Sequence, residues 1–506
     1  MSAAPANGRQ QVRARRLGLD THQEAVVLMH KDCPVCRSEG FTARNQILLQ
    51  NGTHRIIATL YQVTGNWIAH DEAALSESAW ERLGLTDGET LTVAHPEPVA
   101  SLAYVRSRVY GKALSETALR AIIRDIVDGQ YSDVHLSSFL TACATAPLSR
   151  DETVALTRAM VEVGDRLRWT SATVVDKHSV GGLPGNRTTP IIVSIVAALG
   201  LTMPKTSSRA ITSPAGTADA METLAPVDLA VADIHRVVER EGGCIVWGGA
   251  VRLSPADDIL IRVERALDLD TEGQMIASVL SKKIAAGSTH VVIDMPVGPT
   301  AKVRSTAAAE VLAAGLTSVA EAFGLRVTIN AGDGSQPIGR GIGPALEAHD
   351  VLAVLRGAPD APRDLRQRAV TLAGSLIEIG GLAAAGVGHQ MAAHALDDGR
   401  AWAKFQRICE AQGGMRVPPV ARHQRPLLAP RSGPLALIDN RKIAKLAKLA
   451  GAPEDKAAGV ALHVRLGDTV AAGEPLCTVH AESPGELAYA LHYAAANPDI
   501  FGIAET

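Results

Sequence analysis

Aromatic residues are scarce in this chain of 506 residues: Phe, Trp and Tyr make up 3% of it, although 46% of its residues are hydrophobic. A core built on large rings is therefore excluded. The buried side chains must be mainly Ala, Val, Leu and Ile, as is common in α/β proteins. Because the length is sufficient for three or four domains, the composition predicts a multidomain α/β protein.

An excess of charge of either sign is also missing, since the formal net charge is −3. This balance indicates neither a nucleic-acid surface nor a membrane surface. The chain has no apolar run long enough to cross a membrane, and its start, MSAAPANGRQQVRARR, lacks the apolar segment of a signal peptide. We therefore expect a cytoplasmic protein with no nucleic acid and no membrane as partner.

Cysteine is rare as well, and four of the six cysteines are scattered singly: Cys143, Cys244, Cys409 and Cys477. We expect these to be reduced core thiols. Cys33 and Cys36 form a CPVC motif that follows His30. A structural zinc site needs four ligands and the chain has no second CxxC, so we predict no metal site. We interpret the CPVC motif as a turn or as a pair with a minor redox role, with metal binding as the remaining alternative.

Residues 1–98 predict a small, mostly β domain. Short β-type runs alternate with turns such as Asn51-Gly52, and one helix is expected at Ser76–Leu83. The sequence His95-Pro96-Glu97-Pro98 then marks a stiff boundary.

From Ser101 onward the apolar residues recur at helical spacing. The pattern predicts helices at Leu114–Asp128, Ser132–Ala144 and Asp151–Val163, and again across Pro255–Ala286. Between and after these segments, strand, loop and helix alternate, as in an α/β domain.

Two polar, Gly-punctuated loops lie in the stretch Thr173–Leu229. Each follows a short β-type run and precedes a helix, and we expect Thr217 to cap the second helix. Helix N-termini attract oxyanions, and positive charge is nearby on Lys177, Arg187 and Arg209. Hydroxyl donors are added by Ser179, Ser207, Ser208, Ser213 and Thr217. The stretch predicts a phosphate site; the alternative is a pair of Ser/Gly-rich turns at a sheet edge.

Four segments, in chain order, resemble the motifs of the thymidine and pyrimidine-nucleoside phosphorylase family: DKHSVGG, SSRAITSPAGTAD, ASVLSKKIAAG and QPIGRGIGPALE. The resemblance extends from about Ala103 to the C-terminus. The segment before Ala103, together with SRAITSPAGT, is similar to the longer branch of the family, which includes AMP phosphorylases.

The resemblance implies a helical domain at residues 101–170 and 254–286, and a discontinuous α/β phosphate-binding domain at residues 171–253 and 287–430. It also implies a homodimer formed through the helical domain. Residues 431–506 predict an α+β domain, in which GVALHVRLGDTVAAGEPLCTV is similar to the hammerhead fold of lipoyl and biotinyl domains. No Lys lies at its hairpin tip, so we do not expect this domain to be a cofactor-carrying arm. We interpret it as a structural cap.

The resemblance also implies the residue roles and an activity without a cofactor. Inorganic phosphate would be bound by Lys177, Ser179, Ser207 and Thr217. The proton donor to the leaving base would be Asp270, for which a helix cap is the alternative, and His178 would face the base unless it is merely a loop histidine. Further substrate contacts are expected from Gly182, Ser208, Arg209, Ala210, Ile211, Thr212, Ser213, Ser278, Lys282 and Lys302.

The expected reaction is phosphorolysis of thymidine to thymine and 2-deoxyribose 1-phosphate, with AMP phosphorolysis to adenine and ribose 1,5-bisphosphate as the alternative. The substrate is accordingly a nucleoside or a nucleoside monophosphate. Two departures from the short thymidine enzymes bear on this choice: Val263 stands where they have a pyrimidine-reading Arg, with Arg262 one residue away, and Ser213 replaces their His.

Overall fold

The computed structural model describes residues 10–21, 24–210, 213–269 and 271–505. The chain divides into two compact units, residues 1–145 and 146–506.

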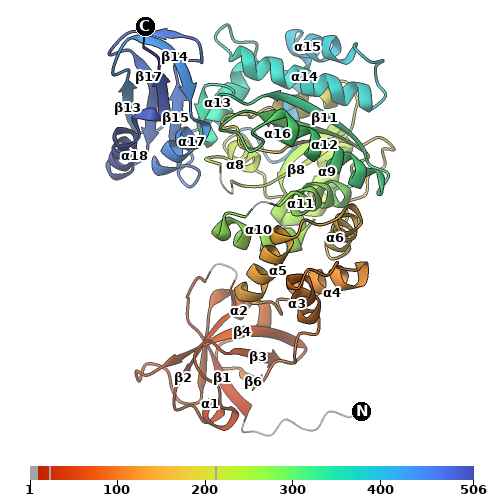
Figure 1. Cartoon of the computed structure of the whole chain (residues 1–506), viewed down its shortest axis with the longest axis vertical. Coiled ribbons are helices and arrows are strands. Elements are labelled where there is room, and N and C mark those ends of the chain that lie inside the picture. Colours follow the sequence, from red (N-terminus) through yellow and green to blue (C-terminus); the bar gives the residue numbers. More distant parts are fainter. Residues whose placement is uncertain (1–9, 22–23, 211–212, 270, 506) are drawn as a thin grey trace. The chain divides into compact units, whose positions relative to one another are not determined.

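The first unit begins with a closed six-stranded β-barrel, coloured red to orange in Figure 1. Its strands, in the order β1-β5-β2-β4-β3-β6, are β1 Gln11–Arg16, β5 Glu72–Leu75, β2 Val26–His30, β4 His54–Val63, β3 Gln46–Asn51 and β6 Thr90–Ala94. The mostly-β prediction is confirmed, and helix α2 (Glu77–Leu83) follows its N-cap Ser76 as expected. Strand β5 was not predicted, because its sequence EAAL carries no β-branched residue.

The CPVC motif opens a short helix, α1 (Pro34–Glu39), which the sequence pattern did not predict. Cys33 is its N-cap residue, and Cys33 and Cys36 are both buried in the barrel core. A hydrogen bond from Cys36 lowers the pKa of the Cys33 thiol. All six cysteines are buried.

Helices follow the barrel. Within the first unit these are α3 Leu102–Val109, α4 Glu116–Val127 and α5 Asp133–Thr145. The second unit begins with α6 (Arg150–Glu162), whose Ser149 and Glu152 form a capping box, and α6 packs against α11 (Glu272–Ala285). The predicted helical segment Pro255–Ala286 consists of α10 (Pro255–Leu267) and α11, because Asp268 adopts a left-handed conformation (φ 51°) and ends α10.

A parallel sheet forms the centre of the second unit. Its strands are β11 Arg326–Asp333, β10 His290–Val297 and β7 Val175–Ser179, followed by the pair β8 Met203–Ser207 and β9 Gly243–Trp247, with a parallel bridge from Val174 to Thr202 joining β7 to β8. Lys177, His178 and Ser179 therefore belong to a strand, whereas the sequence pattern predicts a loop. The strand can carry these polar residues because Asp176 and Lys177 have buried partners of opposite charge.

Helices cover both faces of this sheet, and successive side chains of β10 pack against the helices on opposite faces. Val292 belongs to the large cluster that includes α7 (Thr189–Ala198) and α14 (Arg363–Ile379), whereas its neighbour Ile293 belongs to the cluster of α11 and α12 (Thr306–Glu321). The remaining helices of this part are α8 Thr217–Glu222, α9 Val231–Glu241, η2 Gly248–Val251, α13 Pro344–Leu355, α15 Gly388–Asp397 and α16 Arg400–Ala411.

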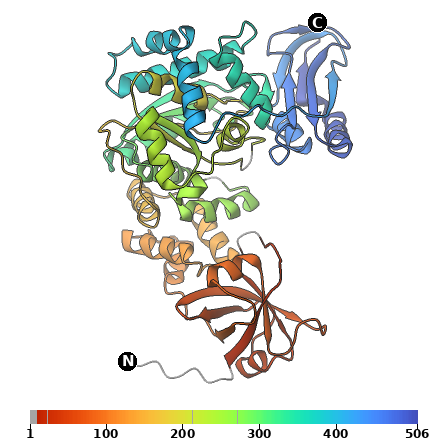
Figure 2. The same ribbon diagram turned by 180° about the vertical axis from the view of Figure 1, so that it is seen from behind.

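The C-terminal segment, blue in Figures 1 and 2, forms its own lobe within the second unit. One sheet has the order β12-β15-β17-β13 (β12 Gly341–Ile342, β15 Gly459–Leu462, β17 Pro475–Ala481, β13 His423–Leu428), and the other has the order β16-β14-β18 (β16 Thr469–Val470, β14 Gly433–Ile438, β18 Phe501–Ile503). Helices α17 (Asn440–Leu449) and α18 (Pro484–Ala496) and the short η3 (Pro498–Ile500) complete it. Strand β13 lies before residue 431 and β12 comes from far earlier in the chain, so the lobe draws on segments outside residues 431–506. The domain boundaries drawn from the sequence stay a prediction.

The described residues include no helix that is both long enough and apolar enough to span a bilayer. The fold class is the one expected: a β domain, a helical bundle, an α/β domain and a C-terminal α+β domain.

A core substitution tests the packing of the second unit. Phe405 of α16 is fully buried in the cluster that α7 and α14 share. We expect Phe405→Ala to lower the free energy of unfolding by about 3–5 kcal/mol, because lost apolar burial adds to the cost of a cavity. The measurement is urea unfolding followed by tryptophan fluorescence. The control Val311→Ala, at an exposed position of α12, should change the free energy of unfolding by at most about 0.5 kcal/mol. Equal effects of Phe405→Ala and Val311→Ala would contradict the assigned core.

Candidate functional site

The candidate site lies at the carboxyl edge of the parallel sheet. Val174 bridges Thr202, and five residues further on Ser179 and Ser207 end strands β7 and β8. In β10, Asp294 is aligned with Ser179. Open α/β sheets bind their ligands at this edge, because the loops from neighbouring parallel strands converge there.

The two Gly/Ser-rich loops are adjacent. We call residues 180–188 the first loop, and residues 208–210 and 213–216, the described residues between β8 and α8, the second loop. Arg187 in the first donates from Nη1 to the hydroxyl of Thr217 (2.5 Å) and from Nη2 to the carbonyl of Ala215 (2.9 Å). Its Nε donates to Glu347 of α13 at 2.7 Å. One guanidinium thus joins both loops to α13.

Thr217 has a different position from the one expected. It is the first residue of α8, and the N-cap is Gly216, with Asp219 accepting a hydrogen bond from the Gly216 amide. Its hydroxyl is thereby free of a capping role and is available to a ligand as well as to Arg187.

Lys177 is buried and is held by two groups on the face of the sheet that α7 and α14 cover. Its Nζ donates to Thr188 Oγ1 at 3.0 Å and lies 3.4 Å from Asp294 Oδ2. Asp294 also accepts from Arg368 of α14 (2.6 Å) and from Asn186 (2.8 Å). Burial alone would raise the pKa of Asp294, but Lys177 and Arg368 outweigh it and hold the pKa below its ordinary value.

A second buried carboxylate, Asp176, lies between two lysines. Lys283 of α11 is 2.6 Å from Oδ2, and Lys205 of β8 is 3.1 Å from Oδ1. Burial opposes the charge of Asp176, yet the two lysines keep its pKa low. Burial also lowers the pKa of Lys283. This cluster joins α11 to the sheet, so the helix that carries Ser278 and Lys282 is positioned by a buried ion pair.

His178 follows Lys177, so its side chain leaves β7 on the opposite face. Burial lowers its pKa well below the ordinary value, and the charges of Lys283, Lys205 and Lys282 lower it further. A neutral imidazole can donate one hydrogen bond and accept another, which suits recognition of a heterocyclic ring.

Ser278 and Lys282 lie one turn apart on α11. Lys282 Nζ is 2.5 Å from Asp257 of α10. Burial would lower the pKa of Lys282, but Asp257 and then Asp258 raise it, so the side chain stays a cation. Both residues therefore lie on the helix that the Asp176–Lys283 pair fixes to the strand of His178.

Ser207 differs from the other candidates because its hydroxyl is unsatisfied. Its side chain is buried, and Oγ has no hydrogen-bond partner among the described residues. An unpaired buried hydroxyl is costly unless a ligand or a water satisfies it.

Other predicted residues lie at the rim of the site. Ser208 and Ser213 are exposed, and Ser213 donates to Ala215 O at 3.0 Å. Gly182 has φ +80°, and a Cβ there would lie 2.3 Å from the backbone nitrogen of Lys302, so only glycine permits this close approach. Asp270, Ile211 and Thr212 lie outside the described residues.

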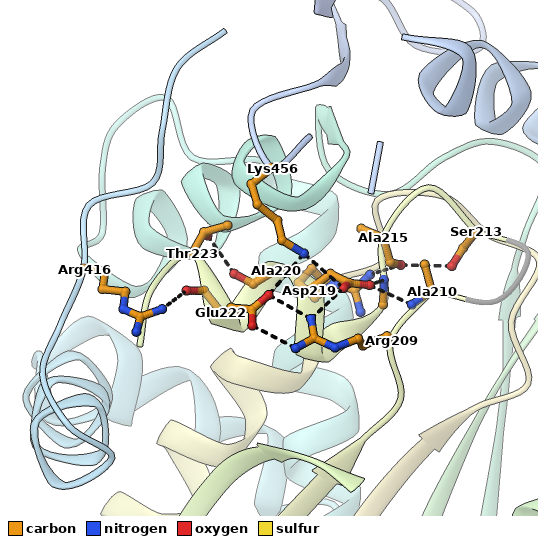
Figure 3. A network of polar contacts seen from close by, with 12 residues as sticks. Arg209, Ala210, Ser213, Ala215, Asp219, Ala220, Glu222, Thr223, Arg416 and Lys456 are labelled. Atoms are coloured by element: carbon orange, nitrogen blue, oxygen red, sulfur yellow. Dashed lines mark hydrogen bonds and ion pairs between the residues drawn. The ribbon is translucent and has the colours of Figure 1, made fainter. Parts of the chain in front are cut away.

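Arg209 and Ala210 belong to a polar network at the start of the second loop (Figure 3). Arg209 donates to both oxygens of Glu222 at 2.8 Å, and its guanidinium lies 5.1 Å from the ring of Trp247. The Ala210 amide donates to Asp219 Oδ2 at 2.6 Å. Arg209 is therefore largely committed to protein partners.

Several charged residues that hold the candidates in place were not predicted from the sequence: Asp176, Lys205, Lys283, Asp294, Glu347 and Arg368. Two of them had a signal, since Asp176 precedes Lys177 in DKHS and Lys283 follows Lys282 in SKK. Asp294 and Arg368 had none, because only the fold brings them to Lys177. Within the part of the chain that the structure describes, no three His, Cys, Asp or Glu side chains are grouped so as to hold a metal ion.

Three family models match the chain. They are described as a helical bundle domain of a glycosyl transferase family (residues 103–164), an a/b domain of a glycosyl transferase family (residues 171–402) and a pyrimidine nucleoside phosphorylase C-terminal domain (residues 435–500). Together with the carboxyl-edge site they define a glycosyl-transfer enzyme of the pentosyltransferase class.

Curated relatives match almost the whole chain. A "Putative thymidine phosphorylase" of Chelativorans sp. (strain BNC1) is 64% identical over 97% of this chain and 97% of its own, and one of Polaromonas sp. (strain JS666) is 60% identical over 98% and 97%. The chain belongs to the thymidine and pyrimidine-nucleoside phosphorylase family. Among solved structures, anthranilate phosphoribosyltransferase from Thermus thermophilus shares the fold, with a TM-score of 0.51 and 21% identity over 61% of this chain and 98% of that one.

The lowered pKa of His178 predicts a pH dependence of stability. The folded state keeps this imidazole neutral, so protons bind preferentially to the unfolded state once the pH falls below the ordinary histidine pKa. As the pH is lowered below about 6.5, the free energy of unfolding of the wild type should therefore fall more steeply than that of His178→Asn. The two slopes should differ by up to about 1.4 kcal/mol per pH unit.

Urea unfolding at pH 7.5, 6.5 and 5.5 measures this difference. The control is His492→Asn, which changes an exposed residue of α18 and should follow the wild type at every pH. Parallel curves for the wild type and His178→Asn would contradict a partly buried imidazole that stays neutral in the folded state.

Proposed function

We propose that the protein catalyses phosphorolysis of a pyrimidine nucleoside, and that thymidine is its substrate. The products are then thymine and 2-deoxyribose 1-phosphate. The family models and the names of the relatives support this class of reaction. No cofactor takes part in the proposed reaction.

The observation that carries the proposal is uncompensated positive charge at the carboxyl edge. The buried carboxylate of Asp294, aligned with Ser179 at this edge, faces two cations, Lys177 and Arg368. A phosphate anion placed there offsets the excess positive charge, and buried charges are stable only when they are balanced.

Hydrogen-bond donors are available for the same ligand. In our proposal, phosphate is bound by Lys177, Ser179, Ser207 and Thr217. The unsatisfied hydroxyl of Ser207 supports this assignment, since phosphate oxygen is an acceptor that would complete it.

In the proposed reaction, a phosphate oxygen attacks the anomeric carbon of the sugar. The new C–O bond forms as the glycosidic C–N bond breaks, and the electron pair of that bond leaves with the base. The transition state has oxocarbenium character and a single displacement inverts the anomeric centre. Fixing phosphate in line with the breaking bond removes much of the entropic cost.

The base is proposed to lie on the other side of the sugar. His178 and the α11 residues Ser278 and Lys282 form the base-binding face, with neutral His178 donating or accepting one hydrogen bond. Gly182, Ser208 to Ser213 and Lys302 are proposed as further substrate contacts. Asp270, which precedes α11, is proposed to give the leaving base its proton.

AMP is the second candidate substrate, and one observation favours it. Val263, which stands where a pyrimidine-reading Arg would be expected, is buried on the core side of α10, with 5% of its surface exposed. This position therefore cannot donate hydrogen bonds to a pyrimidine. The homodimer and the cytoplasmic location expected from the sequence stay predictions.

A substrate panel tests the proposed function. The purified full-length protein is incubated with thymidine, uridine, AMP or CMP, with and without inorganic phosphate, and free base is measured by chromatography. We expect thymine release that depends on phosphate. Adenine release from AMP as the dominant activity would replace thymidine by the second candidate. Base release without phosphate, or no release from any substrate, would overturn phosphorolysis.

Ser207→Ala tests the phosphate site. We expect the KM for phosphate to rise about 10-fold or more, because a hydrogen bond to a charged ligand is lost. Stability should be unchanged within about 0.5 kcal/mol, since the hydroxyl has no described protein partner. Steady-state kinetics at varied phosphate, together with urea unfolding, measure both quantities.

The matched control is Ser194→Ala. Ser194 is also buried, but its hydroxyl donates to Pro190 O within α7 at 2.7 Å. Its loss should affect stability slightly and leave the KM for phosphate unchanged. An unchanged KM in Ser207→Ala would remove Ser207 from the phosphate site.

A further inference from the structure

Lys456 brings a positive charge from the C-terminal lobe to the second loop. It lies in the turn between α17 and β15, inside the segment matched by the C-terminal family model. Its carbonyl accepts a hydrogen bond from the Ala345 amide at the start of α13 (2.9 Å). Its Nζ lies 3.3 Å from Asp219 Oδ1 and 3.1 Å from Glu222 Oε2. Both backbone and side chain of Lys456 are thus bonded outside the lobe.

Asp219 is the group through which Lys456 reaches the second loop. Its side chain is 3% exposed. Oδ2 accepts from the Ala210 amide (2.6 Å) and from the Gly216 amide (2.9 Å), one on each side of the loop. Oδ1 is bound by Arg209 (3.2 Å) and Lys456 (3.3 Å). One carboxylate therefore holds both described ends of the loop, and two cations hold the carboxylate.

The four side chains form a balanced set. Figure 3 shows Asp219 and Glu222 between Lys456 on one side and Arg209 on the other. Arg209 is bonded to both carboxylates, and so is Lys456. Without Lys456, Arg209 alone would have to neutralise two carboxylates, and Asp219 would lose one of the two charges that orient it.

We propose that Lys456 is a positioning residue, through which the C-terminal lobe orients the second loop for substrate binding by way of Asp219. The inference rests on the proposed function, because that function places the substrate contacts in this loop and phosphate on Thr217, directly after Gly216. Lys456 itself does not touch the substrate.

The expected kinetic signature follows from preorganisation. A loop that is already held by Asp219 binds substrate without an ordering cost. If Lys456 is lost, that cost is subtracted from binding, so KM rises. The groups that stabilise the transition state are unchanged once the substrate is bound, so kcat is retained.

Three variants of the full-length chain separate positioning from folding. Lys456→Met removes the charge and keeps the length of the side chain, Lys456→Arg keeps the charge, and Lys445→Met removes an exposed lysine of α17 as the matched control. For a partly exposed ion pair, we expect Lys456→Met to raise the KM for nucleoside and for phosphate about 3- to 5-fold. We expect kcat within about twofold of the wild type, recovery in Lys456→Arg, and no change in Lys445→Met.

Hydrogen exchange gives a readout that does not depend on activity. In Lys456→Met, the amides of Ala210 and Gly216 should exchange about 3- to 10-fold faster, while peptides from β10 exchange as in the wild type. Exchange is followed by mass spectrometry of overlapping peptides without substrate.

The outcomes separate failure of the positioning role of Lys456 from failure of the proposed function. Unchanged KM and unchanged exchange at Ala210 and Gly216 would overturn the positioning role, and so would a loss of kcat with unchanged KM. Absence of phosphate-dependent base release by the wild type would overturn the proposed function. In that case faster exchange in Lys456→Met would still support the contact between lobe and loop, and unchanged exchange would overturn it.

Discussion

Two buried carboxylates, Asp176 and Asp294, organise the centre of the second unit. Each lies at a parallel strand and binds two cations, so that β7, β8, β10, α11 and α14 are joined by charge as well as by apolar packing. Such clusters cost desolvation, and removal of one partner leaves a buried charge uncompensated. Their value to this fold is geometric: they fix the sheet edge and the helix of Ser278 and Lys282 relative to each other.

Under the proposed function, the Asp294 cluster explains why a small anion suits this edge. Its two cations, Lys177 and Arg368, outnumber its one carboxylate, and the hydroxyl of Ser207 has no described partner. Hydrophobic packing of the helices holds these groups in place, since a charged set of this kind would relax if the strands could move. Under the proposed function, phosphate supplies the missing negative charge and is held in line with the sugar.

The C-terminal lobe does more than cover the second unit, because it makes direct contacts beside the candidate site. Its sheet includes β12, which comes from the segment just before α13, and its Lys456 contacts Asp219 and Glu222 beside the second loop. Under the proposed function, in which the second loop binds substrate, this contact makes the lobe part of that loop's environment. Because Asp219 is almost fully buried, a change in the lobe that moves Lys456 reaches the loop through a carboxylate that water can hardly screen.

Much of this molecule followed from its sequence. The order of strand, loop and helix, the Gly/Ser-rich loops that follow Ser179 and Ser207, and the mostly-β N-terminal domain are local or short-range patterns, because hydrophobic period, Gly-rich turns and caps act within a few residues. The closure of the barrel by the unpredicted β5, the pairing of Lys177 with Asp294 and Arg368, and the contact of Lys456 with Asp219 were decided only by the tertiary structure. Those partners are up to 237 residues apart in the chain, and a charge in a sequence does not reveal which distant charge will neutralise it once both are buried.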